Sequence, residues 1–210
     1  MISKNDKNIV YGSSYRGYRI NNGKNSEHSC YKDSLDKTIN IIENKTQRHN
    51  KAHMTRIDVH PPQGMPEIEA SKAMTRVVES MLREISRKHK HSSHDPDISV
   101  IRTTEIGSHE NNLHFHFSIL SNGNAIQNGY TFLESMTRHS ERIFGSSMSG
   151  RVNYSSSNNG TGIMINRNSP DYEEKLQEAV YAGSYLAKTN TKDNLRKGTH
   201  KLSISHSKRK

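Results

Sequence analysis

The stretch Leu113-His-Phe-His-Phe-Ser-Ile-Leu120 decides the fold. Its apolar and polar residues alternate with a period of two, and in an extended strand successive side chains point to opposite faces. One face is therefore apolar and typical of a strand that packs on a core, whereas the other face carries two imidazoles and a hydroxyl. The apolar face holds Leu113, Phe115, Phe117 and Ile119, and the polar face holds His114, His116 and Ser118.

The sequence on either side of this strand predicts further elements from the same kind of spacing. Residues 107–112 have turn composition, so the strands before and after them should be antiparallel neighbours. The predicted order is that of a ferredoxin-like core with an added strand: an α+β fold with a central antiparallel sheet of about five strands and helices packed on it. Strands are expected at 55–60, 97–106, 113–120 and on both sides of 155–161, and helices at 31–50, 67–90, 127–144 and 169–189.

The composition indicates one basic domain with polar ends. The 210 residues include 31 Lys and Arg against 21 Asp and Glu, and the net charge of +10 favours a polyanionic partner, nucleic acid first. We expect residues 1–30 to be a polar, partly disordered extension, 31–191 the folded domain and 192–210 a flexible basic tail. Cys30 is the only cysteine, which excludes an intramolecular disulfide and fits a reducing cytoplasm. No apolar run is long enough to predict a membrane span.

The two histidines on one strand face predict a metal site. Imidazoles two residues apart on a strand project in parallel, so His114 and His116 can bind one ion and leave positions open for a substrate. Glu105, on the preceding strand, is expected to pair near His114 and to complete the site, with His109 in the turn as a rival. These ligands suit Mn²⁺, Mg²⁺ or Zn²⁺, which can polarise a phosphate oxygen. The simpler alternative is a strand whose polar face merely contains histidines.

The predicted last helix carries two tyrosines and a lysine at helical spacing. Tyr181, Tyr185 and Lys188 follow one another at i, i+4 and i+7 and should share a face. A deprotonated tyrosine can attack phosphorus, and a nearby lysine favours the phenolate or steadies the phosphate charge. Gly183 costs a helix interior about 1 kcal/mol relative to Ala, which favours close packing on the sheet as its reason. Taken alone, the motif also fits tyrosines that pack and a lysine that is solvated.

Together, the histidine strand and the tyrosine motif resemble a known superfamily. The stretch 113–120 with Tyr185-Leu-Ala-Lys188 is similar to the HUH motif and the tyrosine motif of rolling-circle replication initiators. More narrowly, Arg56-Ile-Asp-Val-His-Pro-Pro62, the histidine strand and Tyr185-Leu-Ala-Lys-Thr189 resemble the inovirus-type replication protein family, also called the YagK/YfjJ C-terminal domain family. The resemblance covers roughly residues 55–191 and implies an HUH fold.

This resemblance implies an enzyme that nicks single-stranded DNA. In that superfamily a metal holds the scissile phosphate while a tyrosine attacks, which leaves a 5′-phosphotyrosyl enzyme and a free 3′-OH that starts rolling-circle replication of a phage, plasmid or integrated element. By resemblance, His114 and His116 are metal ligands and Tyr185 is the nucleophile. Some relatives repeat Tyr-x-x-Lys, but Ser184 stands where the first of these lysines would be. The catalytic role of Tyr181 therefore stays open.

Several basic residues are candidates for contact with origin DNA. Arg56 shares a strand face with Asp58 and His60 and is expected to orient the site or to contact DNA, a solvent-facing strand edge being the alternative. The chain has no GxxxxGK[ST] loop, so unwinding and synthesis would need a host helicase and polymerase in the cytoplasm of a prokaryotic host. In the tail, the expected contacts to the phosphate backbone are made by Arg196, Lys197 and Lys201.

Two other functions remain compatible with the sequence. The domain could bind DNA without cutting it, or it could be a metal-free RNA phosphoesterase built on two His-x-Ser pairs. In the second case His116-Phe-Ser118 is one half, and only His91-Ser-Ser93 has the spacing of the other. The tract Arg87-Lys-His-Lys-His91, with His94, also resembles a metal-binding segment, although a solvated charge run is the simpler interpretation.

Overall fold

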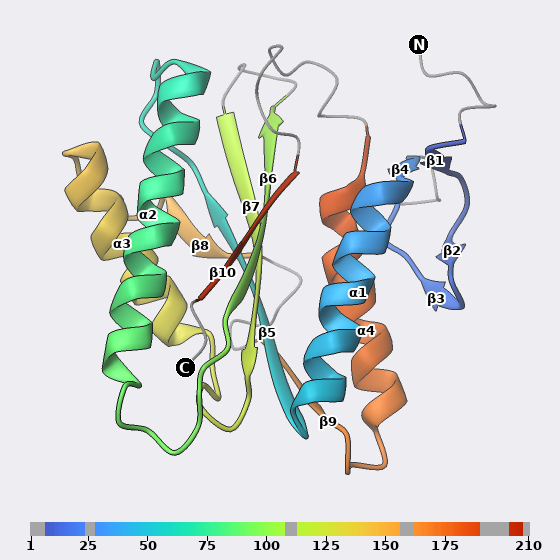
Figure 1. The fold of residues 1–210 in the computed structure, drawn as a ribbon. Helices are drawn as coiled ribbons and strands as arrows, with labels where there is room; N and C mark the ends of the chain where they lie inside the picture. Colours follow the sequence, from blue (N-terminus) through green and yellow to red (C-terminus); the bar gives the residue numbers. More distant parts are fainter. Residues whose placement is uncertain (1–6, 24–27, 108–112, 156–161, 190–201, 208–210) are drawn as a thin grey trace.

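The computed structural model describes residues 7–23, 28–107, 113–155, 162–189 and 202–207, and these form a mixed α+β fold (Figure 1). The described residues contain four α-helices and one large antiparallel sheet. Each helix lies where the sequence predicts one, with boundaries that differ by a few residues. The helices are α1 (Lys32–Arg48), α2 (Glu67–Lys88), α3 (Tyr130–Phe144) and α4 (Tyr172–Ser184).

Within the described residues the sheet has six strands, one more than the sequence predicts. Its order is β10-β6-β7-β5-β8, and β9 pairs with β5 as well. β8 and β9, expected as a pair, do not pair with each other: β8 lies against residues 57–59 of β5 and β9 against residues 51–54. The strands are β5 (Lys51–Val59), β6 (Ser99–Ile106), β7 (Leu113–Asn122), β8 (Val152–Tyr154), β9 (Ile163–Asn166) and β10 (Leu202–His206).

Helices cover both faces of this sheet, and Figure 1 shows α2 and α3 on one side and α1 and α4 on the other. The alternation along β5 explains the division, because Ile57 and Val59 belong to the core under α2 and α3, whereas Ala52 and Met54 belong to the core under α1 and α4. Arg56 and Asp58 have the same parity as Met54. They therefore lie on the α1–α4 face, just beyond the part that the helices cover with apolar side chains.

The described parts of both chain ends are folded against the domain, which corrects two expectations. Leu202–His206, predicted to lie in a flexible tail, forms β10 and pairs with β6 over residues 99–103. Near the N-terminus, four two-residue strands form two small ladders, and Ile20 and Cys30 are almost fully buried. The polar composition of this segment has no periodicity that predicts such packing. The four strands are β1 (Ile9–Val10), β2 (Ser14–Tyr15), β3 (Tyr18–Arg19) and β4 (Cys30–Tyr31).

A buried ion cluster ties α1 to the start of β6. The Asp97 carboxylate lies 3.1 Å from the Lys45 ammonium, 2.7 Å from the Arg48 guanidinium and 2.8 Å from the His49 imidazole. Burial by itself raises the pKa of Asp97, but the hydrogen bond from His49 and the charge of Lys45 outweigh it and hold that pKa well below its usual range. The cluster keeps the end of α1 in place beside the sheet.

Candidate active site

Strand pairing brings four ionisable side chains to one end of the sheet. β7 pairs His114 with Glu105 of β6 and His116 with Asp58 of β5. Directly opposed residues in an antiparallel pair point to the same face, so these side chains meet on the α1–α4 side. The pairing of Glu105 with His114 is the one that the sequence predicts. The contribution of Asp58 follows from the central position of β5, which excludes the alternative of a solvent-facing edge.

His116 lies between two carboxylates. Its Nδ1 is 2.7 Å from Asp58 Oδ1, and its Nε2 is 3.3 Å from Glu105 Oε2. Burial by itself lowers the pKa of this imidazole, but the hydrogen bonds to Asp58 and Glu105 outweigh burial and the pKa is raised. A protonated ring can donate from both nitrogens at once, so the arrangement fits an imidazolium in the free protein.

Two further imidazoles continue the cluster toward solvent. The ring of His60 stands edge-on to that of His114, with 4.3 Å between the centroids, and 6.3 Å separates the rings of His114 and His116. Burial is the main cause that lowers the pKa of both His60 and His114. Their rings are therefore neutral at physiological pH and keep a lone pair that can bind a cation. The sequence places His60 on the correct strand face, but only the structure brings it to His114.

Tyr185 packs on the histidine cluster. Its ring centroid is 5.5 Å from that of His116, and the Arg56 guanidinium carbon and Lys188 Nζ lie over the ring at 4.5 Å and 3.7 Å from its centroid. Such cation–π contacts hold an aromatic ring in a defined orientation. Burial and the nearby charge of Glu105 raise the pKa of the Tyr185 phenol, and the positive charge of Arg56 opposes this shift. The phenol is thus protonated in the free protein.

The end of α4 sets the position of Tyr185. The helix stops at Ser184, and residues Tyr185–Ala187 form a 3₁₀ turn, so the predicted continuous helix to about Thr189 is wrong. Lys188 has an extended backbone and bridges to Cys30 of β4. It reaches the tyrosine ring through this turn and not along a helical stripe. A Cβ on Gly183 would lie 2.9 Å from Thr38 Cγ2 of α1 and 3.3 Å from Met54 Cε of β5, so close packing is the reason for this glycine, but the tightest contact is with α1 and not with the sheet.

The N-terminal segment supports the tyrosine turn from outside. Ser184, in the place of the lysine of the repeated motif, is fully buried, and its hydroxyl accepts a hydrogen bond from the Asn21 amide at 2.7 Å. The Thr189 amide donates to the Ser29 carbonyl at 3.0 Å. A lysine at 184 would have no space for its charge. The departure from the repeated motif therefore has a structural role in this chain.

Comparison with known proteins identifies the family of the chain. The family model of the YagK/YfjJ C-terminal domain matches residues 14–200, which is most of the chain. The chain belongs to the YagK/YfjJ C-terminal domain family. No curated protein and no solved structure matches it. The family match begins at residue 14, so it includes Asn21 and Ser29, the two residues of the N-terminal segment that hold the tyrosine turn. None of the described helices is both long and apolar enough to cross a membrane.

The other predicted site residues of this YagK/YfjJ C-terminal domain have different positions: Arg56 lies beside Tyr185, Tyr181 lies apart from the cluster, and four residues lie outside the described part of the chain. Tyr181 packs under Arg19 of β3, whose guanidinium carbon is 4.9 Å from the ring centroid. Arg56 is only 2% exposed and faces Tyr185, so a direct contact of its guanidinium with DNA on the surface is not supported. Four candidates lie outside the described residues: His109, Arg196, Lys197 and Lys201.

The donor set of the cluster suits a divalent ion. In the described part of the chain, no three His, Cys, Asp or Glu side chains already stand as a metal-binding group. His114, His116 and Glu105 nevertheless supply two imidazole nitrogens and carboxylate oxygens at the same end of the sheet, with His60 as a further imidazole. Nε2 of His116 already faces Glu105 Oε2, so a cation can replace the proton between them.

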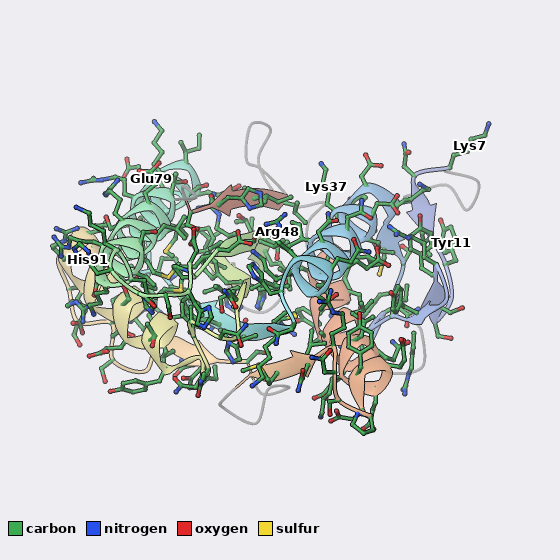
Figure 2. The ribbon with its side chains drawn as sticks, turned by 60° about the horizontal axis from the view of Figure 1, so that its bottom comes forward. Lys7, Tyr11, Lys37, Arg48, Glu79 and His91 are labelled. Atoms are coloured by element: carbon green, nitrogen blue, oxygen red, sulfur yellow. The ribbon has the colours of Figure 1, made fainter. Side chains whose placement is uncertain are left out.

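The two His-x-Ser halves of an RNA phosphoesterase do not come together. His91 and Ser93 are exposed after the C-terminal end of α2, and Figure 2 shows His91 at the periphery of the α2–α3 side. The 22 residues of α2 begin near His60 and span roughly 33 Å. His91 is therefore far from His116, and Ser118 is fully buried beside Arg56. This arrangement therefore does not support the phosphoesterase alternative.

Proposed function

We propose that this domain is a metal-dependent endonuclease that nicks single-stranded DNA with Tyr185 as its nucleophile, on a fold of the HUH type. The observation that carries the proposal is the position of the Tyr185 ring, 5.5 Å from His116 and beneath two cationic side chains. A tyrosine that only packs needs neither a histidine cluster nor buried cations at its ring. A strand-transfer nucleophile needs both a fixed ring and a site for the phosphate.

Each side chain of the cluster has its own role in the proposed reaction. A divalent ion such as Mn²⁺ or Mg²⁺, held by His114, His116 and Glu105, would polarise the scissile phosphate as a Lewis acid. Asp58 hydrogen-bonds Nδ1 of His116 and so orients the imidazole and raises its basicity, as carboxylates beside ligating histidines do. His116 gives up its second proton when it acts as a ligand, because only a neutral imidazole has a lone pair to donate.

The tyrosine step exchanges one phosphate ester for another. Tyr185 Oη forms a bond to phosphorus while the bond from phosphorus to the 3′ oxygen breaks, the phenol proton is lost, and the 3′ oxygen takes up a proton. The products are a 5′-phosphotyrosyl protein and a free 3′-OH. Because burial raises the pKa of Tyr185, the phenolate is scarce in the free protein, and the charge of Arg56 favours its formation. Such a 3′-OH would prime rolling-circle replication by a host polymerase and helicase.

The test is a covalent adduct on a denaturing gel after incubation with a mixed pool of single-stranded DNA and Mn²⁺. We expect an adduct with the unmodified protein and with Tyr181→Phe, because Tyr181 contacts Arg19, and none with Tyr185→Phe or in EDTA. An adduct that survives Tyr185→Phe would refute the nucleophile, and one that forms in EDTA would refute the metal. If no adduct forms but the protein still binds DNA in a salt-sensitive way, the alternative of a domain that binds DNA without cutting it is favoured.

A further inference from the structure

The structure has a large pocket beside the histidine cluster. It has a volume of about 810 Å³, within the range of small-molecule sites, and lies where β5 ends and β7 begins. His60 belongs to both places, since it lines the pocket and its ring is 4.3 Å from that of His114. Ile106 and Leu113 also line the pocket, but they alternate with Glu105 and His114 along their strands, so their side chains point to the opposite face of the sheet. His60 is therefore the link, and a DNA strand bound at the cluster can reach the pocket past His60 at the end of the sheet.

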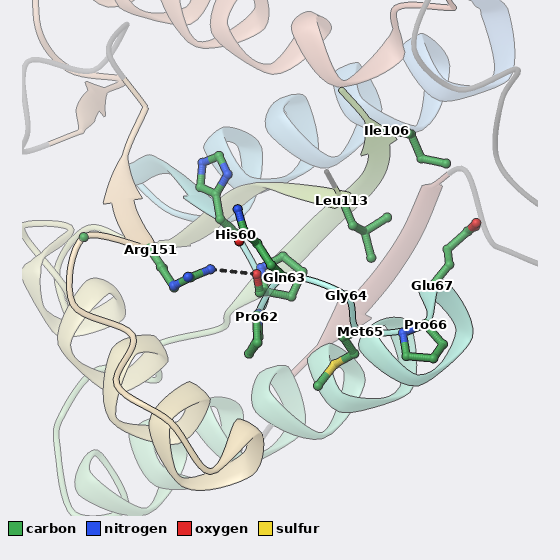
Figure 3. A pocket seen from close by; sticks show the side chains of 12 residues that line it. His60, Pro62, Gln63, Gly64, Met65, Pro66, Glu67, Ile106, Leu113 and Arg151 are labelled. Carbon is green, nitrogen blue, oxygen red and sulfur yellow. Dashed lines mark hydrogen bonds between the residues drawn. The ribbon is translucent and has the colours of Figure 1, made fainter. Parts of the chain in front are cut away.

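The pocket is built to keep its shape. Pro61, Pro62 and Pro66 form much of one wall, and proline fixes its own φ angle. The turn between them uses Gly64 at φ +76°, a conformation that favours glycine. Arg151 closes the other side, since its guanidinium donates to the Pro61 carbonyl at 3.0 Å, as Figure 3 shows. A preformed pocket costs little ordering entropy when a ligand binds.

The lining combines apolar surfaces with a polar rim. Figure 3 shows Ile106 and Leu113 across the pocket from Met65 and Pro66, which together provide apolar contacts for a flat ring. Glu67, the first residue of α2, carries its carboxylate at the rim. An ionised carboxylate only accepts hydrogen bonds. The rim therefore favours a ring that carries an N–H donor.

We propose that this pocket holds one unpaired base of the DNA strand, next to the scissile phosphate, and that Glu67 selects a base with an exocyclic amino group. The inference rests on the proposed function, because it places the phosphate of the same strand at the histidine cluster. Bases of single strands are recognised when they leave the stack and enter such pockets. Cytosine and adenine offer an amino donor to a carboxylate, whereas thymine offers only an acceptor at the same edge.

The first test is cleavage of oligonucleotides that differ only in the nucleotides flanking the cut. We expect the unmodified protein to disfavour thymine at one flanking position by about tenfold, the size of one good base contact. Glu67→Gln should remove that preference, because an amide can also donate to the thymine acceptor. Glu69→Gln, an exposed change on the same helix, should keep it. Cleavage with an unchanged preference in Glu67→Gln would overturn the pocket proposal and leave the proposed function intact.

A second measurement does not depend on cleavage. The methyl group of Met65 lines the pocket, so its ¹³C-labelled NMR signal, assigned with Met65→Leu, reports on occupation. We expect millimolar dCMP to shift this signal in the unmodified protein more than TMP does, and Glu67→Gln to abolish the difference. If no variant cleaves DNA but dCMP shifts Met65 selectively, the pocket proposal stands and the proposed function fails. Equal shifts of the Met65 signal with dCMP and TMP, or no shift with either, would refute the pocket proposal.

Discussion

The contact of Gly183 with α1 provides a sharp test of how Tyr185 is held. In Gly183→Ala, the new Cβ would lie 2.9 Å from Thr38 Cγ2 and 3.3 Å from Ile42 Cδ1 and Met54 Cε. The first distance is too short for any real contact, so Thr38 or the backbone of α4 must move. The substitution gains about 1 kcal/mol in helix propensity, but overpacking of a filled core costs about 1–3 kcal/mol. We expect a net loss in the free energy of unfolding of about 1 kcal/mol.

The matched background is Thr38→Ser, which removes Cγ2 and keeps the hydroxyl. The remaining contacts at 3.3 Å are with the ends of flexible side chains, which can shift by a few tenths of an ångström. In this background Gly183→Ala should stabilise the protein, so the effect changes sign. Urea unfolding of the four proteins of the double-mutant cycle measures it. Equal stabilisation by Gly183→Ala in both backgrounds would show that α4 and α1 are not in tight contact and would refute the reasoning.

Three other changes test the site and its supports. Asp58→Asn keeps an acceptor for His116 but removes the charge, and we expect the Mn²⁺ concentration for half-maximal adduct formation to rise about 10- to 100-fold, with exposed Asp33→Asn as control; an unchanged Mn²⁺ dependence would contradict the role of Asp58. Because the pKa of Asp97 is lowered in the folded protein, its contribution to stability is present above the unfolded pKa of about 3.9 and is lost as the pH falls through the lower folded value; unfolding in urea at pH 5 and pH 3 should therefore show a smaller acid loss in Asp97→Asn, and an equal loss would count against the ion cluster. Ser184→Ala removes the acceptor of the Asn21 amide and should cost about 1–3 kcal/mol in the free energy of unfolding, whereas Ser184→Lys should cost far more because the site is fully buried; thermal unfolding compares the two, and a tolerated lysine would refute the structural role of Ser184.

The sequence by itself predicts the central hairpin and the polar face of its strands. Alternation of side chains along β6 and β7 is a local property, and a short turn leaves few possible registers, so a pairing of Glu105 near His114 could be predicted from the sequence, and the structure gives the exact register. The same reasoning predicts the four helices and the strands on both sides of residues 155–161. In each case the pattern that decides the element lies within the element itself.

Other features depend on contacts between residues far apart in the chain, for which no local pattern exists. β10 pairs with β6 across about 100 residues, and the segment around Cys30 meets Lys188 across about 160. Leu202 and Ile204 do alternate with serines, but over only five residues in a basic tail, and the segment around Cys30 has no strand periodicity. The end of α4 is similar, because helical spacing continues through Tyr185 in the sequence. The chain changes from α4 to a 3₁₀ turn at Tyr185, where Ser184 contacts the N-terminal segment, and helix propensity does not predict this change.

The sequence thus determined which side chains are available for chemistry, and the tertiary structure decided how they are arranged. His114, His116 and Tyr185 were identifiable from strand alternation and from motif resemblance. Only the structure shows that His60 lies beside His114, that the buried Arg56 packs on the Tyr185 ring and that Tyr181 packs against Arg19. The physical reason is that residue type and spacing specify faces within one element. Which faces meet, and what becomes buried between them, is set by packing of the whole chain.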